Sequence, residues 1–380
     1  MSFRLNSDFY KGKKVFVTGH TGFKGSWMCE VLLLSGAEVT GYSLKPPADP
    51  ALFSLCDLEN RMHSIECDIR DLSCLQKALA DAQPQIVIHM AAQPLVRESY
   101  KDPVTTYETN VLGTVNLCEA IRHTESVRSF VNVTTDKVYQ NKEWEWGYRE
   151  NEQLGGFDPY SNSKACSELV TSSYVNSFLQ NKDMAVSTMR AGNVIGGGDF
   201  AVDRIIPDCI RAAEKGEDII LRNPHSIRPY QHVLEPVCAY LLLAQMQYEN
   251  PGLAGAYNIG PGEEDCVTTG ALASIFCDAW NASAGAKDLT ENEGMEKENA
   301  ESGNAAARRL GWTEQSDGGP HEANFLKLDC SRFRKTFGWK PRWSVAEAVA
   351  KTVEWQRCFR AGEDVSECMR KQIHEYLCEK

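Results

Sequence analysis

The strongest constraint on the fold is a regular alternation of short apolar runs and longer amphipathic stretches through the first 190 residues. The apolar runs have the length and β-branched content of buried strands, and the stretches between them have helical periodicity. We predict strands at residues 14–18, 38–42, 64–67, 85–89, 129–133 and 185–189, and helices at 26–35, 72–82, 105–124 and 161–180. Such strands and helices form right-handed βαβ units. The predicted fold class is therefore α/β, with a doubly wound parallel sheet of the Rossmann type.

The alternation fades after residue 190, which indicates a second, smaller domain of mixed α/β structure. The first domain is expected to span residues 1–190 with a return segment at about 233–260, and the second to span 191–232 and 261–380. The return segment is inferred because residues 236–247 have the pattern of another helix of the large domain. Residues 283–320 are polar, charged and Gly-rich, so we predict a surface loop there.

The composition excludes several classes of partner. The chain of 380 residues carries 40 Lys and Arg against 52 Asp and Glu, a net charge of −12, which disfavours nucleic acids and anionic membranes. An anionic small ligand stays possible, because a pocket can be locally positive on an acidic protein. The 14 cysteines form no CxxC pair and no cluster with metal-ligand spacing, so we expect free thiols, no metal and a reducing cytoplasm. No signal peptide or membrane span is expected, because no apolar run is long enough.

A glycine-rich turn joins the first predicted strand to the first helix. Gly19, Gly22 and Gly25 are spaced three apart, and the turn also contains Thr21 and Phe23. Glycine lets a pyrophosphate approach the backbone, and the helix that follows presents free N–H groups to the anion. The sequence therefore predicts a dinucleotide site here, with a purely structural turn as the alternative.

The residues beyond this turn leave the choice between NAD and NADP open. The second strand ends in Gly-Tyr-Ser-Leu-Lys at 41–45, without the acid that usually binds the adenosine ribose. Ser43 and Lys45 could tolerate a 2′-phosphate there. After the third strand, Asp68 and Ile69 are candidates for an adenine contact, although Asp68 could equally be an acid at a helix N-terminus.

A second constellation combines a hydroxyl, a phenol and an ammonium group. Tyr160 and Lys164 are four residues apart and are therefore neighbours on one helix face. A nearby ammonium lowers the pKa of a phenol, so the phenolate could act as a base. Thr135 follows the strand at 129–133, at the carboxyl edge of the sheet where ligands bind.

The glycine turn, the strand-end Thr and the Tyr/Lys helix, in this order, resemble the extended short-chain dehydrogenase/reductase family that modifies nucleotide sugars. The resemblance extends from Gly19 to the Phe-Gly-Trp-Lys-Pro run at 337–341. It implies that Tyr160 is the base on the sugar O4, that Lys164 fixes the nicotinamide ribose of NAD and that Thr135 assists at O4. It also implies a cofactor-lining stretch at Ala91, Ala92 and Gln93.

The residues after Thr135 distinguish branches of this family. Many of its 4,6-dehydratases have Thr-Asp-Glu, whereas this chain has Thr135-Asp136-Lys137. Once hydride has left C4, loss of water across C5–C6 needs an acid for the C6 hydroxyl and a base for the C5 proton. We expect Asp136 to be the acid and Lys137 the base, with an exposed loop pair as the alternative. A 4-epimerase would not need Asp136, and a non-catalytic dinucleotide sensor would not need Tyr160.

The motifs are most similar to those of family members that act on CDP-glucose. This similarity implies formation of the 4-keto-6-deoxy sugar for bacterial O-antigen and other surface polysaccharides, and a homodimer, or a tetramer, formed through helices 105–124 and 161–180. The residues themselves do not distinguish CDP from GDP, UDP or dTDP. The resemblance also implies substrate contacts by Asn193 and by Glu322 beside His321. Arg204 and Arg228 are expected to hold the diphosphate of the nucleotide sugar, because arginine can bind two phosphate oxygens at once, with solvated surface arginines as the alternative.

Overall fold

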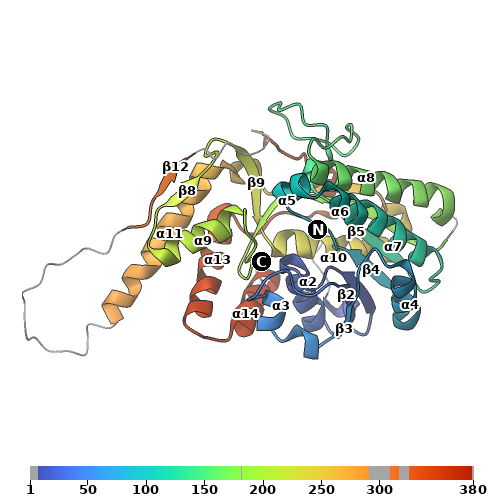
Figure 1. Ribbon diagram of the computed structural model, residues 1–380. Helices are drawn as coiled ribbons and strands as arrows, with labels where there is room; N and C mark the ends of the chain where they lie inside the picture. Colours follow the sequence, from blue (N-terminus) through green and yellow to red (C-terminus); the bar gives the residue numbers. More distant parts are fainter. Residues whose placement is uncertain (1–6, 181, 291–308, 316–324, 379–380) are drawn as a thin grey trace, which may run out of the picture.

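A computed structural model describes residues 7–180, 182–290, 309–315 and 325–378 (Figure 1). Its largest sheet has seven parallel strands in the order β10-β6-β5-β4-β1-β2-β3. These strands are β1 (Lys14–Thr18), β2 (Glu38–Ser43), β3 (His63–Glu66), β4 (Ile86–His89), β5 (Ser129–Val133), β6 (Ala185–Ala191) and β10 (Ala256–Ile259). The predicted doubly wound α/β fold is therefore confirmed.

Helices cover both faces of this sheet because its central strands are apolar on both sides. In β1, Val15 and Val17 pack into one hydrophobic cluster, whereas Phe16 points to the opposite face and joins another. The first face is covered by α2 (Phe23–Leu34) and α10 (Leu234–Glu249). The second is covered by α4 (Leu72–Ala82), α7 (Gly113–Arg122) and α8 (Pro159–Tyr174).

A smaller lobe stands beside the carboxyl end of the sheet, at the left of Figure 1. It contains a three-stranded sheet in the order β11-β9-β7 and the parallel pair β12–β8. The strands are β7 (Asn193–Ile195), β8 (Ile219–Leu221), β9 (Ile227–His232), β11 (Cys266–Thr268) and β12 (Trp312–Glu314). The helices α9 (Ile205–Lys215), α11 (Thr269–Thr290) and α13 (Val345–Arg360) pack around a separate hydrophobic cluster.

Short elements and the C-terminal helices complete the described chain. The C-terminal α12 (Ser331–Phe337) and α14 (Val365–Cys378) return to the core of the large sheet. The others are α1 (Ser7–Tyr10), α3 (Leu52–Leu55), α5 (Val96–Lys101), α6 (Pro103–Tyr107), η1 (Leu58–Asn60), η2 (Glu108–Leu112), η3 (Asp136–Val138), η4 (Val175–Leu179), η5 (Pro251–Leu253) and η6 (Glu263–Asp265).

Several predicted elements differ from the structure. The sheet gains a seventh strand, β10, whose four residues are too short to show a pattern. The loop predicted from residue 283 begins inside α11, because Ala and Leu favour a helix through Thr290, and it also contains β12. The predicted helix at 105–124 is divided into α6, a π-helical turn η2 and α7, and the helix at 161–180 ends in the π-helical turn η4.

The expectation of free thiols is wrong for one pair, since Cys67 and Cys74 form a disulfide. The other twelve cysteines are free. In the part of the chain that the structure describes, no helix has the length and apolar character to cross a membrane. Within the same residues, no group of three His, Cys, Asp or Glu side chains is placed to hold a metal ion.

Candidate active site

A cavity of about 1000 Å³ lies at the carboxyl edge of the large sheet, between the sheet and the smaller lobe. Ligands of open α/β sheets bind at this edge, and the volume is at the upper end for small-molecule sites. The cavity is lined by most of the predicted site residues: Gly19, Thr21, Gly22, Phe23, Gly25, Asp68, Ile69, Ala91, Ala92, Thr135, Asp136, Lys137, Tyr160, Lys164, Asn193, Arg204 and Arg228. Residues predicted from distant parts of the sequence are therefore brought together.

The glycine turn leaves an open space in front of α2. Gly19 has a φ of +76°, and a Cβ there would lie 2.7 Å from the Ala91 nitrogen. A Cβ on Gly25 would overlap the Gly19 carbonyl oxygen. At Gly22 a Cβ would meet nothing closer than 3.5 Å, and no side chain caps the helix that starts there. The free N–H groups and the open space fit the pyrophosphate of a dinucleotide.

The far end of the cavity contains the residues predicted to meet adenosine. Thr21 Oγ1 lies 2.9 Å from Ser43 Oγ and donates to the Leu44 carbonyl oxygen at 2.9 Å. The Asp68 carboxylate accepts from the Arg70 guanidinium at 2.8 Å, and this hydrogen bond lowers the pKa of Asp68. Asp68 therefore reaches the cavity as one half of an ion pair.

Gln93, a predicted cofactor contact, is held by hydrogen bonds next to the cavity. Its amide Nε2 donates to the Leu95 carbonyl oxygen at 3.1 Å and to Thr106 Oγ1 at 2.9 Å. Its Oε1 accepts from the Leu95 N–H at 2.6 Å. Gln93 is not among the residues that line the cavity, and these bonds hold its side chain against Leu95 and α6. Ala91 and Ala92 do line the cavity.

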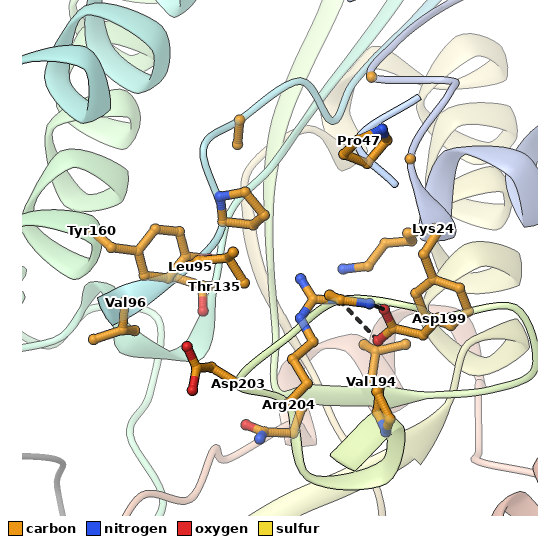
Figure 2. A pocket seen from close by; sticks show the side chains of 18 of the residues that line it. Lys24, Pro47, Leu95, Val96, Thr135, Tyr160, Val194, Asp199, Asp203 and Arg204 are labelled. Atoms are coloured by element: carbon orange, nitrogen blue, oxygen red, sulfur yellow. Dashed lines mark hydrogen bonds and ion pairs between the residues drawn. The ribbon is translucent and has the colours of Figure 1, made fainter. Parts of the chain in front are cut away.

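Tyr160 stands in the first turn of α8, where Pro159 and a cap by Asp158 start the helix. Its ring and the Thr135 side chain lie on the same wall of the cavity (Figure 2). Burial raises the pKa of Tyr160 to about 12, and a hydrogen bond with Thr135 partly opposes this rise. The phenol is therefore in place to contact a sugar hydroxyl together with Thr135.

Lys164 lies on the same helix as Tyr160 and contacts the end of β5. Its Nζ donates to the Val133 carbonyl oxygen at 3.1 Å, and burial lowers its pKa to about 8. The pKa of Tyr160 is shifted most by its own burial, and then by Thr135, Asp136, Arg204 and Asp158. The lowering of this pKa by Lys164 therefore stays a prediction.

Asp136 is the most unusual group in the cavity. Its Oδ1 accepts from Thr135 Oγ1 at 2.9 Å, while its buried Oδ2 has no hydrogen-bond partner among the described residues. Burial raises the pKa of Asp136 even though Lys137, Thr135 and Arg228 oppose the shift. A buried carboxyl group with a raised pKa and one oxygen free of protein partners is well placed to exchange a proton with a ligand. The half-buried Lys137 lies next to it.

The opposite wall carries the arginines expected to meet a diphosphate. Arg204 extends into the cavity and pairs with Asp199 at 3.0 Å (Figure 2). Arg228 is only 6% exposed and donates to the Ile227 carbonyl oxygen at 2.9 Å. Asn193 begins β7 at the same edge. The predicted contact Glu322 lies outside the described residues.

Lys24 is a cavity residue that we did not predict. Figure 2 shows its side chain on the same side as Asp199 and Arg204. Burial, Arg204 and Lys164 together lower its pKa to about 8. The signal in the sequence was its place between Phe23 and Gly25, inside the glycine turn.

The sequence is similar to those of known enzymes that act on nucleotide sugars. The family model described as GDP-mannose 4,6-dehydratase matches residues 16–352. The CDP-glucose 4,6-dehydratase of Salmonella typhimurium is 43% identical over 98% of both chains. The dTDP-glucose 4,6-dehydratase of Streptomyces antibioticus is 29% identical over 91% of this chain and 93% of its own.

A solved structure shares the fold at lower identity. It is the UDP-glucuronic acid 4-epimerase of Bacillus cereus in complex with UDP-glucuronic acid and NAD, which matches with a TM-score of 0.73 and 20% identity over 91% of this chain and 99% of that one. The family match and the Salmonella relative each cover most of the sequence. The chain is therefore a member of the GDP-mannose 4,6-dehydratase family, within the extended short-chain dehydrogenase/reductases.

Proposed function

We propose that this protein is a CDP-glucose 4,6-dehydratase, a hydro-lyase that uses NAD. The observation that carries the proposal is the buried Asp136, whose free oxygen lies in the same cavity as Thr135 and Tyr160. A 4-epimerase has no use for an acid at this position, whereas dehydration needs one. Cytidine is proposed because the 43% identical relative is named for CDP-glucose.

The cofactor would lie along the glycine turn, with its pyrophosphate in front of Gly22 and its adenosine toward Asp68 and Ile69. Lys164 would hold the nicotinamide ribose, and Ala91 and Ala92 would line the path between. NAD, when bound, supplies the hydride acceptor for C4, the hydride donor for C6 and a positive charge that favours the Tyr160 phenolate.

The chain's own residues would then move three protons. Tyr160, assisted by Thr135, takes the O4 proton. The new ketone acidifies the C5 proton, which Lys137 removes. Asp136 protonates the departing C6 hydroxyl, so water leaves across C5–C6. Lys137 would then return its proton to C5 as C6 receives its hydride, which gives the 4-keto-6-deoxy sugar. Before the next turnover Tyr160 would lose its proton to solvent and Asp136 would regain one.

The nucleotide sugar would enter from the side of the smaller lobe. Arg204, Arg228 and Asn193 would hold its diphosphate, and Glu322 its nucleotide end. This assignment gives residues 1–190 and about 233–260 to the cofactor, and residues 191–232 and 261–380 to the nucleotide sugar.

The proposal extends to assembly and place of action. We expect a homodimer, or a tetramer, because exposed apolar side chains lie on η2 and α8. The twelve free cysteines suit a reducing cytoplasm. The product would serve deoxysugar synthesis for O-antigen.

The test is turnover of CDP-, GDP-, UDP- and dTDP-glucose by the purified protein, each with NAD and NADP, read by product mass. We expect a 4-keto-6-deoxy product that is formed fastest from CDP-glucose with NAD. Retention of the C6 oxygen would favour the 4-epimerase instead. If Tyr160→Phe turned over as fast as the wild type, Tyr160 would lose its role as the base. Tight NAD binding without turnover of any sugar would favour a dinucleotide sensor.

A further inference from the structure

A buried carboxylate connects the two halves of the site. Glu168 lies on α8, one helical turn after Lys164 and two turns after Tyr160. Its Oε1 accepts from Thr134 Oγ1 at 2.6 Å. Thr134 immediately precedes Thr135, so one hydrogen bond ties the catalytic helix to the strand end that carries the other catalytic side chains.

An arginine from the neighbouring strand also binds the Glu168 carboxylate. Arg190 of β6 donates to Oε1 at 2.7 Å through Nε and to Oε2 at 2.6 Å through a terminal nitrogen. Thr188 donates to Oε2 at 2.9 Å. Both ionic side chains are 4% exposed, so Glu168 accepts four hydrogen bonds in a dry environment. Such a two-pronged pair fixes geometry as well as charge.

Arg190 also holds the far end of the catalytic loop. Its other terminal nitrogen donates to Tyr139 Oη at 2.7 Å and to the Glu150 carbonyl oxygen at 3.0 Å. Thr134 and Tyr139 directly flank residues 135–138, which include Asp136 and Lys137. The ion pair therefore clamps this loop at both ends.

Stability alone does not account for this arrangement. A buried ion pair often contributes nothing net compared with well-packed apolar side chains, because its desolvation cost is high. Directional hydrogen bonds, in contrast, fix the relative position of the groups that they join. We propose that Glu168 is a positioning residue that, through Thr134 and Arg190, sets the catalytic loop in register with Tyr160. The inference rests on the proposed dehydratase function.

The test uses two threonines that make the same kind of bond to the same carboxylate. Thr134→Val removes the hydroxyl that leads to the catalytic loop, and Thr188→Val removes the one that leads into the sheet. Glu168→Gln is unsuitable as the first variant, because the Glu168 charge also raises the pKa of Lys164 against the effect of burial. We would measure kcat, KM and the unfolding temperature for each variant.

We expect Thr134→Val to lower kcat at least about tenfold, because small misplacements of catalytic groups are costly. Its KM should change less than about twofold, since no substrate contact is lost. Thr188→Val should lower the unfolding temperature by about as much as Thr134→Val does, and it should leave kcat unchanged. Thr134→Ser, which restores the hydroxyl, should recover most of the rate.

Equal losses of kcat in the Thr134→Val and Thr188→Val variants would overturn the proposal, as would a wild-type rate in Thr134→Val. Should Thr134→Val not fold, Glu168→Asp keeps the charge beside Arg190 but withdraws the oxygen from Thr134. The same loss of kcat is then expected, and its absence would overturn the inference. The measurements use whichever nucleotide glucose the wild type turns over best. If that substrate is not CDP-glucose, the proposed substrate is wrong, but the comparison of the Thr134 and Thr188 variants still tests the role of Glu168.

Discussion

At the residue scale, Asp136 has the environment of a general acid. Burial raises its pKa, and its Oδ2 has no protein partner within the described residues. Asp136→Asn keeps the shape but has no proton of comparable acidity to give. We expect turnover to fall about a hundredfold or more. The first step, in which the sugar C4 is oxidised and bound NAD is reduced, should stay close to the wild-type rate in a single turnover. Absorbance of the reduced nicotinamide would follow the first step, and product mass the second.

A matched control for this prediction is Asp203→Asn, which makes the same change in charge within the same cavity. The Asp203 carboxylate pairs with Arg222 at 3.1 Å and not with Thr135. We expect no accumulation of reduced nicotinamide in this variant. If Asp136→Asn slowed C4 oxidation and elimination to the same degree, its role as the acid would be rejected.

Lys24 leads us to predict that ligand binding depends on pH. Its pKa is lowered to about 8, so its positive charge is lost as pH rises through that value. The affinity for NAD should therefore fall above pH 8, because the glycine turn that would hold the pyrophosphate loses a positive charge. Lys24→Arg should bind equally well on both sides of pH 8, since guanidinium stays charged. Lys24→Met should bind weakly at every pH.

Titration calorimetry with NAD below and above pH 8 would measure this dependence. Lys164 also has a pKa lowered to about 8, so the Lys24 variants are needed to separate the two lysines. An unchanged fall in affinity in Lys24→Met would assign the dependence to Lys164 instead.

The sequence predicted individual site residues where spacing along one element was enough. Tyr160 and Lys164 were found because they share a helix face, and Thr135 because it follows a strand. Lys24 was missed because a lysine in the first turn of a helix usually faces solvent. The hydrogen bond between Gln93 and Thr106 could not be predicted, because it is a tertiary contact with α6.

At the element scale, periodicity was informative for long elements and uninformative for short ones. All six predicted strands were found, whereas β10 was missed, because its four residues have meaning only beside β6. The end of α11 was read as a loop because its polar character outweighed its helix-forming residues. The π-helical turns η2 and η4 were not predicted, since they leave the apolar pattern nearly unchanged.

The N-terminus of α2 can be tested separately from its packing. A methyl group on Gly22 would point into open space, whereas one on Gly25 would overlap the Gly19 carbonyl. Gly22→Ala should therefore keep its unfolding temperature and lose NAD affinity about tenfold or more, because the methyl group takes the space of the pyrophosphate. Gly25→Ala should be destabilised by about 1–3 kcal/mol through overpacking. Calorimetric unfolding and NAD titration would distinguish them, and equal effects of both variants would contradict an anion site at this helix.

At the scale of the whole molecule, the C-terminal chain joins the smaller lobe to the large sheet. The Glu235 carboxylate of α10 accepts from the Trp343 N–H at 2.9 Å and from the Tyr376 hydroxyl at 2.6 Å. The buried Glu30 of α2 pairs with Arg370 of α14 at 3.0 Å. These interactions join the C-terminal segment to α10 and α2, which pack on the large sheet. They therefore help to hold the two walls of the cavity together.

The helices α6 and α8, at the right of Figure 1, and the turn η2 carry exposed apolar side chains. Val104, Leu112 and Leu169 are 65%, 54% and 58% exposed, on α6, η2 and α8. Neighbouring exposed apolar side chains of this kind indicate a protein interface.

We expect the wild type to be a dimer by size exclusion with light scattering, and Leu112→Glu or Leu169→Glu to be monomeric, because a buried charge without a partner opposes association. Ile220→Glu is the matched control, since Ile220 is also 58% exposed but lies on β8 in the smaller lobe. A wild-type monomer, or the same loss of assembly in the control, would show that these helices are not the interface.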